Sequence, residues 1–101
     1  MRRFEDPVGL IRVTVGEAFA VALVGNPNTG YNWQATVDAQ HLELLMQEFE
    51  MESKAVGAGG RDVFRFRALE TGETHLAFEY RRPWGGQVLD IRRIGVIIAR
   101  L

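Results

Sequence analysis

Apolar and polar side chains alternate with a period of two along most of this 101-residue chain. Successive residues of a β-strand point to opposite faces of a sheet, so this alternation is typical of strands with one buried face. It predicts strands at residues 11–15, 19–23, 31–37, 64–68 and 76–80. Residues 88–101 are rich in Val and Ile and predict a long final strand, in which Gly95 indicates a bulge or bend.

Residues 42–50 are ambiguous, because their pattern fits two structures. The main apolar residues have the i, i+3, i+4, i+7 spacing of an amphipathic helix: Leu42, Leu45, Met46 and Phe49. From this pattern alone we predict a helix. The alternative is a strand with two faces, one formed by Leu44, Met46 and Glu48 and the other by Leu45, Gln47 and Phe49.

Short strands separated by Gly, Pro and Asn turns, with no internal repeat, predict an all-β protein. We predict an immunoglobulin-like β-sandwich or barrel of about seven mostly antiparallel strands. With 47% hydrophobic and 25% charged residues, the composition is that of a soluble globular protein, and the length suits one core. We therefore expect a single domain over residues 1–101. The chain has no cysteine, so packing must stabilise it without disulfides.

Strand direction places three connections at the same end of the predicted molecule. If consecutive strands run antiparallel, loops that are two strands apart emerge at the same end. This condition brings together residues 25–30, 55–61 and 81–87. The connections near residues 38–40 and 70–72 fall at the opposite end.

The sequence offers little from which to build an enzyme. Ser53 is the only serine, and His41 and His75 lie in segments assigned to the end opposite the three loops, so a Ser-His-Asp triad is not expected. Two separated histidines and scattered carboxylates lack the spacing of metal ligands. We predict no catalytic residue, no metal site and no cofactor.

The charge distribution limits the classes of partner that the protein is expected to bind. A net charge of -1 with interleaved acidic and basic residues gives no footprint for nucleic acid or an anionic membrane, so we expect a protein or small-molecule partner and a monomeric chain. Acidic residues follow Met1-Arg2-Arg3 where a signal peptide would be apolar. We expect a secreted or periplasmic protein whose signal is missing from this sequence, or a cytoplasmic one if Met1 is the native start.

The three loops have compositions that suit a binding surface. Asn26 can cap its own turn, Pro27 has a fixed φ and Gly30 can take a positive φ, which together predict a stiff first loop. Residues 57–60 carry almost no side chains, so a partner backbone could approach or pair with them. Trp84 is a large aromatic residue in a loop. Each feature also has a simpler explanation: a plain turn, a flexible hairpin and a tryptophan folded over the core.

Together the three loops resemble the chagasin family of cysteine peptidase inhibitors. The family pattern is Asn-Pro-Thr-Thr-Gly-aromatic, then Gly-X-Gly-Gly, then Arg-Pro-aromatic. This chain has, in the same order, Asn26-Pro27-Asn28-Thr29-Gly30-Tyr31, Gly57-Ala58-Gly59-Gly60 and Arg82-Pro83-Trp84. The similarity spans nearly the whole chain, including residues 64–68 and 72–74, and it favours a strand over a helix at residues 42–50.

The resemblance implies an immunoglobulin-like, non-catalytic protein that inhibits papain-like cysteine peptidases of the papain and cathepsin class. Inhibition would be reversible and competitive, with the three motifs occluding the active-site cleft. Asn28 and Thr29 would lie over the catalytic cysteine, the backbone of residues 57–60 along one wall, and Trp84 on an aromatic platform along the other. Arg82 would orient the third loop. Asn28 departs from the family, which usually has threonine there.

Two other functions stay open at this point. An immunoglobulin-like adhesion or ligand-binding module would use an exposed tryptophan for another partner and would not inhibit a peptidase. An enzyme would need Asp62, Glu79 or Asp90 in a concave pocket with a perturbed pKa.

Overall fold

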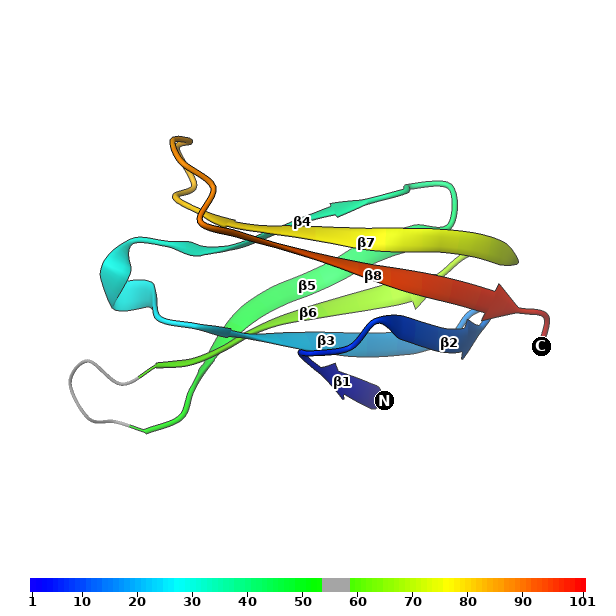
Figure 1. Cartoon of the computed structure of the whole chain (residues 1–101). Coiled ribbons are helices and arrows are strands. Elements are labelled where there is room, and N and C mark those ends of the chain that lie inside the picture. Colours follow the sequence, from blue (N-terminus) through cyan, green and yellow to red (C-terminus); the bar gives the residue numbers. More distant parts are fainter. Residues whose placement is uncertain (54–58) are drawn as a thin grey trace.

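The computed structural model describes residues 1–53 and 59–101, which form eight strands in two sheets packed face to face (Figure 1). The elements are β1 (Arg2–Glu5), β2 (Leu10–Thr14), β3 (Ala18–Gly25), the 3-10 turn η1 (Pro27–Thr29), β4 (Asn32–Val37), β5 (Leu42–Met51), β6 (Gly60–Ala68), β7 (Gly72–Arg81) and β8 (Asp90–Ala99). The sheet orders are β1-β3-β6-β5 and β2-β8-β7-β4. This division of strands is that of immunoglobulin domains, so the predicted fold is confirmed.

The first strand was not predicted. β1 has the sequence Arg-Arg-Phe-Glu, in which one apolar residue cannot establish a period of two. It pairs in parallel with β3 at the edge of its sheet, and β2 pairs in parallel with β8, whereas the other four strand pairs are antiparallel. The described residues contain no helix that is long and apolar enough to cross a membrane.

The helix predicted from the pattern of residues 42–50 is wrong, because this segment is β5 and pairs with β6. A bulge between Leu44 and Met46 explains the misleading spacing. Residues seven apart point to opposite faces of a regular strand, but the extra residue at the bulge puts Leu42 and Phe49 on the same face. For the same reason Leu44 and Met46 lie on opposite faces, which corrects the face assignment of the strand alternative as well.

The core lies between the two sheets, and most of its residues are the alternating apolar residues of the predicted strands. Phe64 of one sheet packs against Phe78 of the other, with ring centroids 5.1 Å apart. Fifteen buried residues form the main cluster: Ile11, Val13, Phe19, Val21, Leu23, Trp33, Leu42, Phe64, Phe66, Ala68, Leu76, Phe78, Ile94, Val96 and Ile98. Their burial removes apolar area from water, which is the main force that holds the sheets together.

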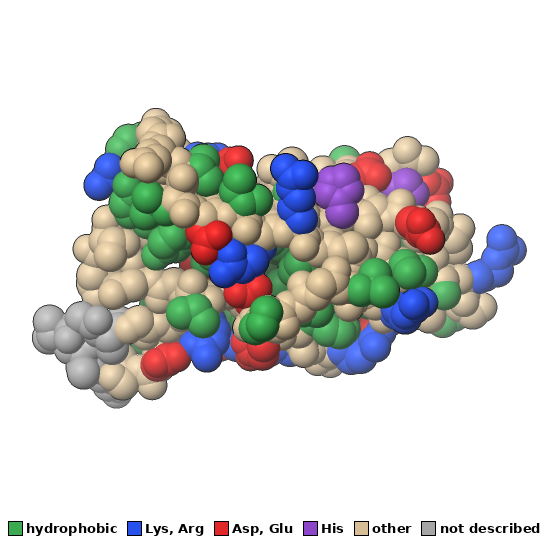
Figure 2. Space-filling view, viewed as in Figure 1, with side chains coloured by type: hydrophobic (Ala, Val, Ile, Leu, Met, Phe, Trp, Pro, Cys, Tyr) green, Lys and Arg blue, Asp and Glu red, His purple; other side chains and the backbone are tan. Residues whose placement is uncertain are grey.

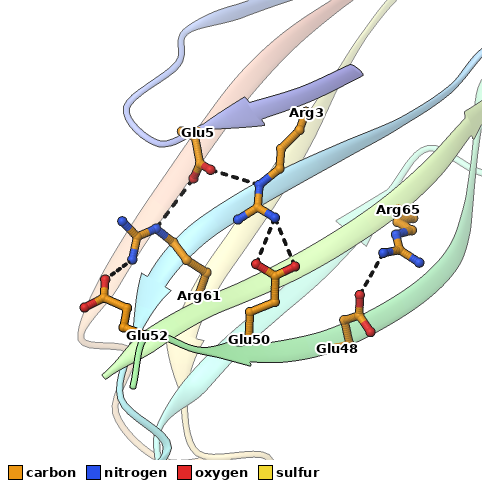
Figure 3. A network of polar contacts seen from close by, with 7 residues as sticks. All are labelled: Arg3, Glu5, Glu48, Glu50, Glu52, Arg61 and Arg65. Atoms are coloured by element: carbon orange, nitrogen blue, oxygen red, sulfur yellow. Dashed lines mark hydrogen bonds and ion pairs between the residues drawn. The ribbon is translucent and has the colours of Figure 1, made fainter. Parts of the chain in front are cut away.

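An ion-pair network crosses the outer face of the β1-β3-β6-β5 sheet (Figure 3). Arg3 donates to both carboxylate oxygens of Glu50, at 2.8 and 3.0 Å, and to Glu5 at 2.9 Å. Arg61 pairs with Glu5 at 3.5 Å and also with Glu52. The network therefore links edge strand β1 to the β5–β6 hairpin across β3. Each exposed pair contributes only about 0–1 kcal/mol to stability. The ion pairs of Arg3 and Glu5 nevertheless connect edge strand β1 to the neighbouring hairpin.

The strand ends that bound three connections lie at the same end of the sandwich, as predicted from strand direction (Figure 1). These connections are the first loop (residues 26–31), between β3 and β4, the second loop (residues 52–59), between β5 and β6, and the third loop (residues 82–89), between β7 and β8. The β4–β5 and β6–β7 connections lie at the opposite end.

Gly60 lies where backbones crowd at the base of this end. It pairs with Gly25 of β3 on one side and with Met51 of β5 on the other. A Cβ added to Gly60 would lie 2.0 Å from the carbonyl oxygen of Glu50. Because that atom belongs to the backbone, no side-chain rotation can relieve the overlap.

Gly60→Ala should therefore lower the free energy of unfolding by roughly 1–3 kcal/mol, as expected for overpacking. Gly9→Ala is the matched control, because a Cβ there meets nothing within 4 Å, and it should be neutral or raise stability by up to about 1 kcal/mol. Urea denaturation measures both. Equal stabilities of the two variants would contradict this account.

Candidate functional site

The first loop is built from hydrogen bonds between its own residues. The side-chain oxygen of Asn26 accepts the Asn28 N–H at 3.1 Å, which confirms the predicted cap. The Thr29 hydroxyl donates to the Asn26 carbonyl at 2.8 Å and accepts the Tyr31 N–H at 3.2 Å. Gly30 has a φ of 80°, the positive value predicted for it. The Thr29 hydroxyl is thus used inside the loop, and Asn28 is an exposed polar residue at its tip.

The second loop meets the first loop at its base. Gly59 accepts the Glu52 N–H at 3.1 Å, and a Cβ on Gly59 would lie 3.1 Å from the Gly25 carbonyl oxygen. Gly60 is buried within β6. The predicted site residues Gly57 and Ala58 lie outside the described residues. Of this motif the structure therefore places Gly59 at the root of the loop and Gly60 as the buried first residue of β6.

The third loop carries a solvent-exposed aromatic side chain. Trp84 is 78% exposed, so it is not folded back over the core. The Gly85 N–H donates to the Arg82 carbonyl at 3.1 Å and closes a turn around Pro83 and Trp84. Figure 2 shows hydrophobic side chains gathered at this end of the molecule, at the upper left, where Figure 1 draws the third loop.

The third loop also contacts the first loop. The Arg82 guanidinium lies over the Tyr31 ring, 4.6 Å from its centroid, which is cation–π geometry. A Cβ on Gly30 would lie 3.9 Å from both the Arg82 side chain and the Trp84 ring. The structure therefore brings two of the three predicted motifs into direct contact.

An aromatic column supports the two loops from below. The Tyr80 ring lies 5.9 Å from the Tyr31 ring and 5.0 Å from the Trp33 ring, centroid to centroid. The Tyr80 hydroxyl accepts the Asn26 N–H at 3.2 Å, and the Trp33 indole N–H donates to the Val24 carbonyl at 2.9 Å. Sequence reasoning identified Tyr80 only as a strand residue. The available signal was its position as the last inward-facing residue before the third loop.

Asp62 is the one buried charged residue among those that the structure describes, with 5% of its surface exposed. Its carboxylate accepts the Trp33 backbone N–H at 3.2 Å. The same oxygen would lie 2.9 Å from a Cβ on Gly25, so glycine leaves room for it. Burial raises the pKa of the Asp62 carboxyl, and the hydrogen bond from Trp33 opposes this shift in part.

The three carboxylates considered as candidates for an enzyme, Asp62, Glu79 and Asp90, lie in different environments. Asp62 is enclosed in the sandwich, whereas Glu79 and Asp90 are open to solvent and pair with Arg81 and Arg92, respectively. Across residues 1–53 and 59–101, no three His, Asp or Glu side chains are placed to share a metal ion.

Comparison with known proteins identifies relatives over most of the chain. A family model described as "Chagasin family peptidase inhibitor I42" matches residues 12–98. Chagasin of Trypanosoma cruzi is 31% identical over 87% of this chain and 86% of its own, and amoebiasin-1 of Entamoeba histolytica is 32% identical over 79% of each. The crystal structure of a cysteine protease inhibitor from Entamoeba histolytica has the same fold, with a TM-score of 0.82 and 22% identity over 96% of this chain and 94% of that one.

The raised pKa of Asp62 predicts a specific dependence of stability on pH. The folded state binds the Asp62 proton more tightly than the unfolded state, so this group contributes stability below its unfolded pKa, near 3.8, and loses it as the pH rises through the folded value. Asp62→Asn keeps an acceptor for the Trp33 N–H but carries no charge. The free energy of unfolding of Asp62→Asn relative to the wild type should therefore rise between about pH 3 and pH 7.

Thermal or urea unfolding of both proteins over this pH range tests the point. The difference between them is needed because hydrogen bonds with basic side chains lower the pKa of Glu17, Asp38 and Asp90, which act in the opposite direction. A difference that stays constant or falls with pH would contradict the burial of a charge at Asp62.

Proposed function

The chain belongs to the chagasin family of peptidase inhibitors, and we propose that it inhibits papain-like cysteine peptidases by closing their active-site cleft with its three-loop end. It is an inhibitor and not an enzyme. The observation that carries the cleft-filling role is the exposed Trp84 beside the polar tip of the first loop, at the shared end of the sandwich.

Each loop has a proposed contact. Asn28 reaches toward the catalytic cysteine, and Thr29 supports it from inside the first loop through its hydroxyl. The backbone of the second loop lies along one wall of the cleft, and Trp84 lies on an aromatic surface of the other wall. Arg82 orients the third loop through its contact with Tyr31. These contacts involve the six residues 26–31, the motif at 57–60 and the three residues 82–84.

Preorganisation explains how such a surface can bind tightly without reacting. Internal hydrogen bonds already order the first loop, so docking costs less conformational entropy and more of the contact energy is retained as affinity. A polar tip that presents no peptide carbonyl in attack geometry forms no acyl-enzyme. Inhibition is therefore reversible and competitive with substrate.

A fluorogenic assay with papain tests this function. Increasing inhibitor should suppress papain activity completely near one equivalent. A module that binds some other partner would leave papain fully active at about 10 μM inhibitor, some ten-thousandfold above a nanomolar inhibition constant. That result would contradict the proposed function.

Trp84→Ala should weaken inhibition by about 2 kcal/mol or more, roughly thirtyfold, because exposed tryptophans at interface centres are common hot spots. The variant should keep its stability, since most of the Trp84 surface already lies in water. Leu69→Ala is the matched control, because Leu69 is 42% exposed and lies in the β6–β7 connection at the opposite end. Inhibition constants that respond equally to both substitutions would remove Trp84 from the interface.

A further inference from the structure

We propose that Tyr80 and Asp62 are positioning residues, which hold the first loop in a fixed place relative to the other two loops. The inference rests on the proposed function, because it concerns the readiness of the same three-loop end for docking. Neither side chain lies at the tips, so neither is proposed to touch the peptidase.

The first loop needs such support because of its place in the fold. The second and third loops each join antiparallel neighbours in one sheet, so backbone hydrogen bonds of the β5–β6 and β7–β8 ladders hold their ends. The first loop joins β3 to β4, which belong to different sheets and do not pair. No backbone ladder sets the distance between its two ends, and side chains must do so.

Tyr80 holds the start of the first loop. Its hydroxyl accepts the Asn26 N–H at 3.2 Å, and its ring packs against those of Tyr31 and Trp33. Its own carbonyl accepts the Leu89 N–H at 2.9 Å, at the far end of the third loop. Tyr80 therefore connects the start of the first loop to the end of the third loop.

Asp62 holds the end of the first loop. Its carboxylate accepts the Trp33 N–H at 3.2 Å, two residues after Tyr31. Asp62 itself lies two residues after Gly60, where the second loop joins β6. Because β6 and β4 are in different sheets, this hydrogen bond crosses the sandwich and fixes the first loop to the frame of the second.

Loss of either contact should lower the fraction of molecules whose loops are ready to dock. The apparent dissociation constant rises in inverse proportion to that fraction. When the loops rearrange faster than they dock, the loss of affinity appears in the association rate constant, because the complex that forms is unchanged. Removal of a contact with the peptidase would instead raise the dissociation rate constant, as is usual for interface substitutions.

Four variants of the full chain test the proposal, with papain binding followed by surface plasmon resonance. Tyr80→Phe removes only the hydroxyl, and Asp62→Leu removes the acceptor but keeps a side chain that branches at Cγ. Each should lower the association rate constant by up to about fivefold, the limit set by the loss of one net hydrogen bond, and change the dissociation rate constant by less than about twofold. Asp62→Asn keeps an acceptor and should restore the wild-type rate.

Ile98→Val is the control for stability alone. Ile98 is buried near the end of β8 at the opposite pole, and loss of a methylene there should destabilise the fold without changing either rate constant. The proposal is wrong if Tyr80→Phe and Asp62→Leu keep the wild-type association rate constant, or if they weaken binding by raising the dissociation rate constant. It is also wrong if Ile98→Val lowers the association rate constant as much as they do.

Amide hydrogen exchange separates this inference from the proposed function, because it needs no peptidase. Tyr80→Phe should speed exchange at the Asn26 amide and Asp62→Leu at the Trp33 amide, each by about fivefold, whereas Ile98→Val should not act selectively at these amides. A wild type that fails to inhibit papain but shows these local effects would overturn the proposed function alone. Unchanged exchange at both amides would overturn the positioning role.

Discussion

A hydrogen bond across the sandwich, from the Trp33 backbone N–H to the Asp62 carboxylate, is the interaction on which the three-loop end depends. The first loop passes from one sheet to the other, so the backbone ladders that shape a hairpin cannot hold it. Around this bond the fold places glycine at position 25 and an aromatic column headed by Tyr80. A buried carboxylate costs stability, but it gives the loop a defined place.

Inhibition by a docked three-loop end depends on the shape of the loops and requires no chemical reaction by this chain. No residue of this chain has to donate a proton or attack a bond, so the demands fall on the shape and rigidity of three tips. The first and third loops satisfy these demands together, since Arg82 and Trp84 lie beside Tyr31 and Gly30. The N-terminal strand adds a more distant support, because Glu5 pairs with Arg61, which in turn pairs with Glu52 at the start of the second loop.

Much of this arrangement could be predicted from sequence, because local rules govern it. A period of two identifies strands regardless of context, and alternating strand direction then puts the three loops at one end. The turn chemistry of the first loop is equally local: Asn26 and Gly30 adopt the hydrogen bond and backbone angle that their residue types predict. The thirteen motif residues were identified differently, by resemblance to a family pattern, and their contacts with a peptidase stay predictions.

The features that sequence reasoning missed depend on contacts between distant segments. The bulge in β5 shifts its faces and imitates a helical spacing, and β1 is a strand only because β3 lies beside it. Tyr80 and Gly60 read as an ordinary strand residue and a loop glycine until the fold places them against Asn26 and Glu50. The sequence suggested Asp62 only as a candidate carboxylate of an enzyme. In the structure it is buried and accepts a hydrogen bond from the Trp33 backbone N–H.

The most direct test of the central claim is to map the surface of this protein that a papain-like peptidase covers. Amide chemical shifts of the isotope-labelled chain, recorded with and without papain whose cysteine has been blocked by a small reversible thiol cap, would provide the map. The account predicts changes at Asn28, Gly59 and Trp84, and none at His41 or Leu69 at the other pole. Changes centred on the opposite pole or on the outer face of a sheet would contradict it.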